Sequence, residues 1–213
     1  MKAVVLGATG LIGTSLIRHL ADQTACTSVT SLSRRRHIAS IDKVDEQVID
    51  FDNLAAHAAH ITGDVLFSTL GTTKAQAGSI AAQKIVDVDY QFNVAKIAAD
   101  NKVPHYVLVS SSGANAASRN PYLKMKGELE DAVKQLPFER ISILQPSLLL
   151  GPRQPARKGE VIGQFIMPLF TWLPGLRKYR PIHCDMVAKK MWRVCEDQTD
   201  AIATYRLDEI FDA

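Results

Sequence analysis

Three regularly spaced glycines constrain the fold of this 213-residue chain more than any other feature: Gly7, Gly10 and Gly13. They follow a short apolar run, Ala3–Leu6, and precede Leu11–Leu20, where apolar residues recur at helical spacing. Glycine at such a turn permits a positive φ angle and a close approach between backbones. The pattern therefore predicts a β-strand that turns tightly into an α-helix packed on a sheet.

Apolar runs rich in β-formers alternate with helical patterns along the first two thirds of the chain. Such alternation is typical of parallel strands joined by crossover helices, and residues 79–100 form the longest predicted helix. The expected strands are Ala3–Leu6, Ser28–Leu32, Gln47–Asp50, Val65–Phe67, Val107–Ser110 and Arg140–Leu144. We therefore expect an α/β fold, a Rossmann-type doubly wound parallel sheet. A single domain over residues 1–213 should carry a small C-terminal cap or lid at 151–185.

Composition excludes several other classes of protein. The formal net charge is only +3, which is too small and too scattered to indicate a nucleic-acid partner. The three cysteines, Cys26, Cys184 and Cys195, cannot all pair and show no zinc-ligand spacing, so we expect no metal and a reducing compartment. The longest near-apolar stretch, Val161–Leu173, is too short to span a membrane. We therefore predict a cytoplasmic monomer or homodimer without a membrane span.

The glycine turn also predicts a dinucleotide site, because the unpaired N–H groups of a helix N-terminus attract a diphosphate. Its spacing, Gly-x-x-Gly-x-x-Gly, indicates a class related to the Gly-x-Gly-x-x-Gly fingerprint. About 20 residues further on, where NAD-binding proteins carry an acid, this chain has Arg34 and Arg35. Guanidinium groups bind a 2′-phosphate, so these residues predict NADP (NADPH), with NAD less favoured. A solvated basic loop is the alternative interpretation.

A tyrosine and a lysine four residues apart, Tyr122 and Lys126, share one face of a predicted helix. An ammonium group near a phenol favours the phenolate, which can exchange a proton with a carbonyl or alcohol oxygen while hydride moves. Upstream, a predicted strand ends in Ser110, Ser111 and Ser112, at the edge of the sheet where open α/β folds bind ligands. A serine hydroxyl there can polarise the same oxygen, although turn formation is an equal alternative.

Together these motifs resemble the short-chain dehydrogenase/reductase superfamily, and best its atypical, extended-type NAD(P)-binding branch similar to the Tat-interacting protein and its oxidoreductase-like relatives. The segments that carry the resemblance span nearly the whole chain: VLGATGLIG, FSTLGTTKAQAG, VSSSGANAASRNPYLKMKGELE, QPSLLLGPR and RPIHCDMVAKKMW. The resemblance implies a catalytic set of Ser111, Tyr122 and Lys126, with Ser112 as the alternate serine.

The same resemblance implies which residues contact the cofactor. The diphosphate and the adenosine phosphate would lie on Gly7, Thr9, Gly10, Leu11, Ile12, Gly13, Arg34 and Arg35. The adenine would lie by Asp50 and Phe51, and the inner ribose by Leu70, Gly71 and Thr72. The nicotinamide half would lie by Tyr122, Lys126, Gln145, Pro146, Ser147 and Leu148. Gln145 replaces the arginine that relatives often carry at its position.

Three functions fit these expectations. The first is an NADP(H)-dependent oxidoreductase that transfers hydride to or from a small carbonyl or alcohol substrate. The second is a non-catalytic NADP(H)-binding regulatory or scaffold protein, since fold and cofactor do not establish turnover. The third is an epimerase or dehydratase that uses its cofactor transiently.

Overall fold

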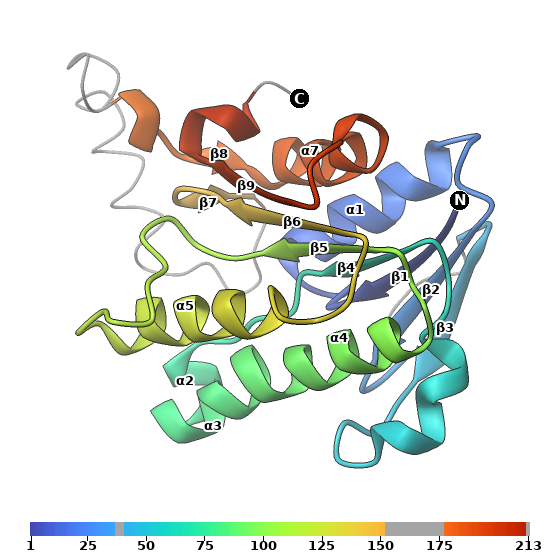
Figure 1. The fold of residues 1–213 in the computed structure, drawn as a ribbon, viewed down its shortest axis with the longest axis horizontal. Coiled ribbons are helices and arrows are strands. Elements are labelled where there is room, and N and C mark those ends of the chain that lie inside the picture. The colour runs from blue at the N-terminus through green and yellow to red at the C-terminus, as the bar shows by residue number, and fades with distance from the viewer. Residues whose placement is uncertain (37–40, 152–176, 212–213) are drawn as a thin grey trace.

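The computed structural model describes residues 1–36, 41–151 and 177–211 of the chain (Figure 1). Most of the expected cap, residues 152–176, lies outside these ranges. Within them, no helix has the length and apolar character needed to cross a membrane.

Seven parallel strands form one sheet in the order β3-β2-β1-β4-β5-β6-β9. Their bounds are β1 Lys2–Leu6, β2 Ser28–Ser33, β3 Val44–Val48, β4 Val65–Ser68, β5 His105–Val109, β6 Arg140–Gln145 and β9 Ile202–Arg206. The predicted Rossmann-type fold is confirmed. The strand order reverses between β1 and β4, and ligands of open α/β sheets bind at the carboxyl edge beside such a reversal.

Helices cover both faces of the sheet, as Figure 1 shows. On one face, α1 (Leu11–Asp22) packs against α7 (Cys184–Asp197). On the other lie α4 (Gln91–Asp100) and α5 (Pro121–Val133). Burial on both sides explains why the central strands are nearly continuous apolar runs. Each face has its own apolar core.

Shorter elements complete the described chain. They are the 3₁₀ turns η1 (Leu54–His60), η3 (Arg177–Tyr179) and η4 (Leu207–Ile210), the helices α2 (Lys74–Ala77) and α3 (Ile80–Lys84), and the π-helical turn η2 (Ile85–Tyr90). A separate parallel pair consists of β7 (Leu149–Leu150) and β8 (Ile182–His183).

The structure departs from the sequence prediction at the two edges of the sheet. Strand β3 lies at 44–48 instead of 47–50, and β9 was not predicted. Both are edge strands with exposed positions, so neither is an apolar run that periodicity could detect. The helix expected over 79–100 is interrupted by the π-helical turn η2, a feature that is rare and frequently functional.

Candidate functional site

The glycine turn after β1 is tightly packed against the loop that follows β4. Gly7 has a φ of +87°, and a Cβ on it would lie 2.5 Å from the backbone nitrogen of Leu70. A Cβ on Gly13 would lie 2.2 Å from the carbonyl oxygen of Gly7. Thr69 donates from Oγ1 to the carbonyl oxygens of Leu6 and Gly7, both at 3.0 Å. The first and third glycines therefore permit the contact that joins the two loops.

The first turn of α1 offers backbone donors to a ligand. Gly10 is the N-cap and provides no side-chain acceptor, while Thr14 Oγ1 donates to the Gly10 carbonyl oxygen at 2.9 Å. Thr9 and Gly10 are exposed, whereas Leu11 is half-buried and Ile12 is buried in the core. N–H groups at an uncapped helix start remain available to an anion, so this turn fits a diphosphate.

The loop predicted beside the inner ribose is held by a buried acid that sequence reasoning missed. Gly71 is exposed and Thr72 is half-buried, and the Thr72 backbone N–H donates to Asp87 Oδ1 at 2.6 Å. Gln83 Nε2 donates to Asp87 Oδ2 at 3.3 Å and to the Thr72 carbonyl oxygen at 3.2 Å. Burial raises the pKa of Asp87, and the positive charge of Lys126 opposes that rise. Asp87 thus links the ribose loop electrostatically to the predicted catalytic lysine.

A signal for Asp87 was present in the sequence. Gln83, Asp87 and Gln91 recur every four residues, so they form a polar stripe along one face of the predicted helix. All three are buried, and Gln91 Nε2 donates to the Asp87 carbonyl oxygen at 2.7 Å. A buried polar stripe at helical spacing indicates a hydrogen-bonded network, because buried polar groups need partners.

Helix α5 carries the predicted tyrosine and lysine. Asn120 caps the helix, since its Oδ1 accepts from the backbone N–H of Tyr122 at 2.9 Å, and Pro121 occupies the first turn. Tyr122 is 38% exposed, whereas Lys126, one turn further on, is only 4% exposed. The tyrosine is therefore accessible to solvent, whereas the lysine is buried and interacts electrostatically with Asp87.

The predicted serines lie where β5 ends, beside the loop that follows β6. Ser111 and Ser112 are half-buried, and the Ser112 N–H donates to the Pro146 carbonyl oxygen at 3.0 Å. Ser147 Oγ donates to the Arg180 carbonyl oxygen at 2.5 Å, and Leu148 is exposed. The serine loop (residues 110–112) and the predicted nicotinamide loop (residues 145–148) are thus in direct contact.

The side chain of Gln145 belongs to a buried network. Its Nε2 donates to both carboxylate oxygens of Glu130, at 2.9 and 3.0 Å, and its Oε1 accepts from Arg206 Nε at 3.2 Å. Ser110 Oγ also donates to the Glu130 carboxylate. Sequence reasoning did not find Glu130 or Arg206. These partners occupy the side-chain amide of Gln145. Any contact with the cofactor at this position would therefore have to come from the Gln145 backbone or from neighbouring residues.

The predicted adenosine residues lie after β2 and β3. Arg34 and Arg35 are exposed directly after β2. Asp50 is exposed, while Phe51 is buried against Tyr90 with ring centroids 4.8 Å apart. Burial and a hydrogen bond to Asp52 raise the pKa of Tyr90, and the charge of Arg34 opposes this rise. Arg34 and the Phe51–Tyr90 pair therefore lie near one another.

Three consecutive residues at the start of α7 bring possible metal-ligand atoms within 4.8 Å of one another: His183, Cys184 and Asp185. All three side chains already have protein partners, and Cys184 Sγ lies 3.4 Å from Ser15 Oγ. His183 Nδ1 accepts from the Asp185 N–H at 3.4 Å as the helix cap, and Asp185 Oδ1 accepts from Ser15 Oγ at 2.5 Å. That hydrogen bond from Ser15 lowers the pKa of Asp185. The group therefore ties α7 to α1.

Comparison with known proteins agrees with this geometry. A family described as NAD(P)H-binding matches residues 7–163. A protein named FMP52, mitochondrial, from Candida albicans is 36% identical over 89% of this chain and 85% of its own. Another FMP52, from Eremothecium gossypii, is 40% identical over 75% of this chain and 71% of its own. HTATIP2 from Rattus norvegicus is 37% identical over 73% of this chain and 66% of its own.

Solved structures share the fold at low sequence identity. WbmH of Bordetella bronchiseptica in complex with NAD⁺ has a TM-score of 0.74 and 15% identity, covering 99% of this chain and 79% of its own. MoeE5 in complex with UDP-glucose and NAD has a TM-score of 0.72 and 14% identity, with the same coverage. At such identities the likeness shows the fold alone.

The cytoplasmic location predicted from the sequence is wrong. The fungal relatives at 36–40% identity are named mitochondrial proteins. The prediction relied on cysteine usage and on the lack of a spanning segment. Neither property distinguishes one reducing compartment from another, so neither identified the cytoplasm.

The family match covers most of the chain. The glycine turn, the uncapped start of α1 and the strand order of this chain all fit a bound dinucleotide. This chain belongs to the NAD(P)H-binding family and is an atypical short-chain dehydrogenase/reductase-like protein.

Proposed function

We propose that the protein is an NADP(H)-dependent oxidoreductase that transfers hydride to or from a small carbonyl or alcohol substrate. The observation that carries this proposal is the pair on α5. Tyr122 is accessible to a substrate, and Lys126 is buried one turn along the helix, facing the charge of Asp87. A buried lysine is uncommon, because desolvating a charge is costly.

The cofactor would be held by the first turn of α1 and by the loops after β2, β3, β4 and β6. Backbone N–H groups after Gly10 would bind the diphosphate, and Arg34 with Arg35 would bind the 2′-phosphate. Residues 33–36, Ser-Arg-Arg-Arg, carry no acid that would repel this phosphate. The nicotinamide ring, when bound, supplies or accepts the hydride.

The side chains of this protein would manage the proton. Tyr122 gives its phenolic proton to the substrate oxygen during reduction and takes it back during oxidation. The ammonium group of Lys126 stabilises the phenolate, and the negative charge of Asp87 attracts that ammonium group. Ser111 hydrogen-bonds the same substrate oxygen and orients it, with Ser112 as the alternate donor.

Stopped-flow mixing of NADPH-loaded protein with a panel of aldehydes and ketones tests this proposal. Sustained loss of nicotinamide absorbance supports it. Tight NADPH binding with no absorbance change supports the regulatory or scaffold alternative, and a transient change with recovery supports the epimerase or dehydratase alternative. Both of these outcomes contradict the proposal.

The matched variants are Tyr122→Phe and Tyr205→Phe, because Tyr205 packs against the core beneath α1 and α7, on the face of the sheet opposite to α5. Tyr122→Phe should reduce turnover by about 100-fold or more, the usual contribution of a general acid, with NADPH affinity unchanged. Tyr205→Phe should keep full activity. An active Tyr122→Phe variant removes Tyr122 from the mechanism.

Cofactor preference depends on the two arginines after β2. Replacing Arg34 and Arg35 together by alanine should weaken NADPH binding by at least about tenfold, because each charged hydrogen bond to a phosphate contributes ~1.5–3 kcal/mol. NADH binding should change little. Arg18→Ala, at an exposed position on α1, is the control. Fluorescence titration measures both affinities, and equal weakening of NADPH and NADH discards the arginine assignment.

A further inference from the structure

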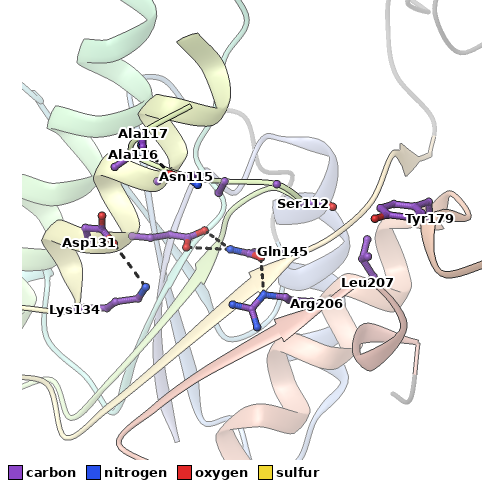
Figure 2. A pocket seen from close by; sticks show the side chains of 14 residues that line it. Ser112, Asn115, Ala116, Ala117, Asp131, Lys134, Gln145, Tyr179, Arg206 and Leu207 are labelled. Carbon is purple, nitrogen blue, oxygen red and sulfur yellow. Dashed lines mark hydrogen bonds and ion pairs between the residues drawn. The ribbon is translucent and has the colours of Figure 1, made fainter. Parts of the chain in front are cut away.

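A cavity of about 720 Å³ lies between the serine loop, α5 and the ends of β6 and β9 (Figure 2). Its lining includes Asn115, Glu130, Lys134, Tyr179 and Arg206. Neither Tyr122 nor Lys126 lines it. Ser112 and Gln145 do line it, so the cavity adjoins the proposed site of proton transfer, and its volume suits a small organic molecule.

The guanidinium of Arg206 is oriented by a chain of hydrogen bonds. Both oxygens of the buried Glu130 accept from Gln145 Nε2, which turns Gln145 Oε1 toward Arg206 Nε at 3.2 Å. Figure 2 shows the remaining guanidinium nitrogens directed away from Gln145. A planar guanidinium held at Nε presents its other N–H groups in a fixed fork.

This fork has no acidic partner in the part of the chain that the structure describes. No described carboxylate lies within 4.0 Å of the Arg206 guanidinium nitrogens. The two acids that line the cavity are engaged elsewhere. Glu130 accepts from Ser110 and Gln145, and Asp131 lies 3.9 Å from Lys134 Nζ. An oriented, unpaired guanidinium on a cavity wall matches the geometry of a carboxylate.

The rest of the cavity adds a donor and an apolar surface. Asn115 Oδ1 accepts from the Ala117 N–H at 2.7 Å, and its NH₂ group has no acceptor among the described residues. Tyr179, 44% exposed, and Leu207 form the apolar part. Leu207 has a φ of +44°, a conformation that residues other than glycine, asparagine and aspartate rarely adopt. Such strain at a cavity wall is typical of ligand sites.

We propose that this cavity binds a small organic carboxylate. The carboxylate lies on the fork of Arg206 with support from Asn115, and the apolar part of the ligand lies against Tyr179 and Leu207. The proposal does not depend on the choice between NADP and NAD.

Titration of ¹⁵N-labelled protein with benzoate tests this site, read on the Arg206 Nε–Hε and Asn115 side-chain amide signals. Benzoate should shift both signals saturably. Benzamide, which has the same ring and no charge, should bind at least about tenfold more weakly, because it forfeits charge-assisted hydrogen bonds. Inorganic phosphate should also bind more weakly, since it has no apolar part. Equal binding of benzamide, or tighter binding of phosphate, overturns the proposal.

Two variants locate the effect. Arg206→Gln should weaken benzoate binding at the Asn115 signal by at least about tenfold, and Arg206→Lys should give an intermediate affinity because it keeps charge without the fork. Arg193→Gln, at an exposed position on α7, should bind like the unmodified protein. Unchanged NADPH affinity and signal dispersion show that each variant is folded. Unchanged benzoate affinity in folded Arg206→Gln refutes the site.

Discussion

A buried histidine at the start of β5 makes stability depend on pH. Ser142 Oγ donates to Gln198, so its oxygen accepts from His105 Nε2, 2.8 Å away. His105 is 1% exposed, and its Nδ1 has no partner among the described residues. A second proton would place an N–H at Nδ1 with no acceptor. Burial, with the nearby charge of Arg140, lowers the pKa of His105 to about 4.

The sign and size of the effect follow from linkage. The pKa of His105 is lower in the folded chain than its ordinary value of 6.5, so between these values the unfolded chain binds more protons. The stability that depends on neutral His105 is complete above pH 6.5 and is lost as pH falls toward 4. At about 1.4 kcal/mol per pH unit, the loss reaches roughly 2 kcal/mol at about pH 5 and approaches 3 kcal/mol near the folded pKa.

Urea unfolding followed by circular dichroism between about pH 7 and pH 5 measures this loss. The informative quantity is the difference between the unmodified protein and the variant in the unfolding free energy lost over this range. His105→Gln removes the titrating group, so its stability should fall by roughly 2 kcal/mol less over this range. His60→Gln, at an exposed histidine, should follow the unmodified protein. Parallel pH profiles for His105→Gln and the unmodified protein refute the reasoning.

Further predictions concern the turn, the buried acid and the α1–α7 contact. Gly13→Ala would place a methyl 2.2 Å from the Gly7 carbonyl oxygen. This variant should lower the free energy of unfolding in urea by about 1–3 kcal/mol and abolish NADPH binding. NADPH binding as tight as in the unmodified protein would contradict the role of the tight turn. Asp87→Asn keeps an acceptor for the Thr72 N–H but removes the charge facing Lys126, so single-turnover hydride transfer should slow by about tenfold. An unchanged rate would show that this charge is not used. Ser15→Ala should raise the pKa of Asp185, followed by carboxyl NMR. The stabilisation from a lowered carboxylate pKa is complete above the pKa of the unfolded chain and is lost as pH falls through the pKa of the folded chain. The unfolding free energies of Ser15→Ala and the unmodified protein should therefore become equal in strongly acidic solution. Equal unfolding free energies at neutral pH contradict this prediction.

The central part of the fold and several proposed site residues were predictable from the sequence. Strands β1, β2, β4, β5 and β6 and the helix at Leu11–Asp22 follow from local periodicity and glycine spacing, because these depend on neighbours within a few residues. The four-residue interval between Tyr122 and Lys126 likewise places both on one helix face. The roles of these two residues remain predictions.

Tertiary structure decided the edges of the sheet and the partners of the buried polar groups. Strand β9 exists because it pairs with β6, and Gln145 meets Arg206, 61 residues away, only through that pairing. Asp87 accepts a hydrogen bond from Thr72 only because the strand order places the loop after β4 against the π-helical turn. Periodicity reports which face of an element is buried, whereas a hydrogen bond between distant residues depends on how the elements are arranged in space.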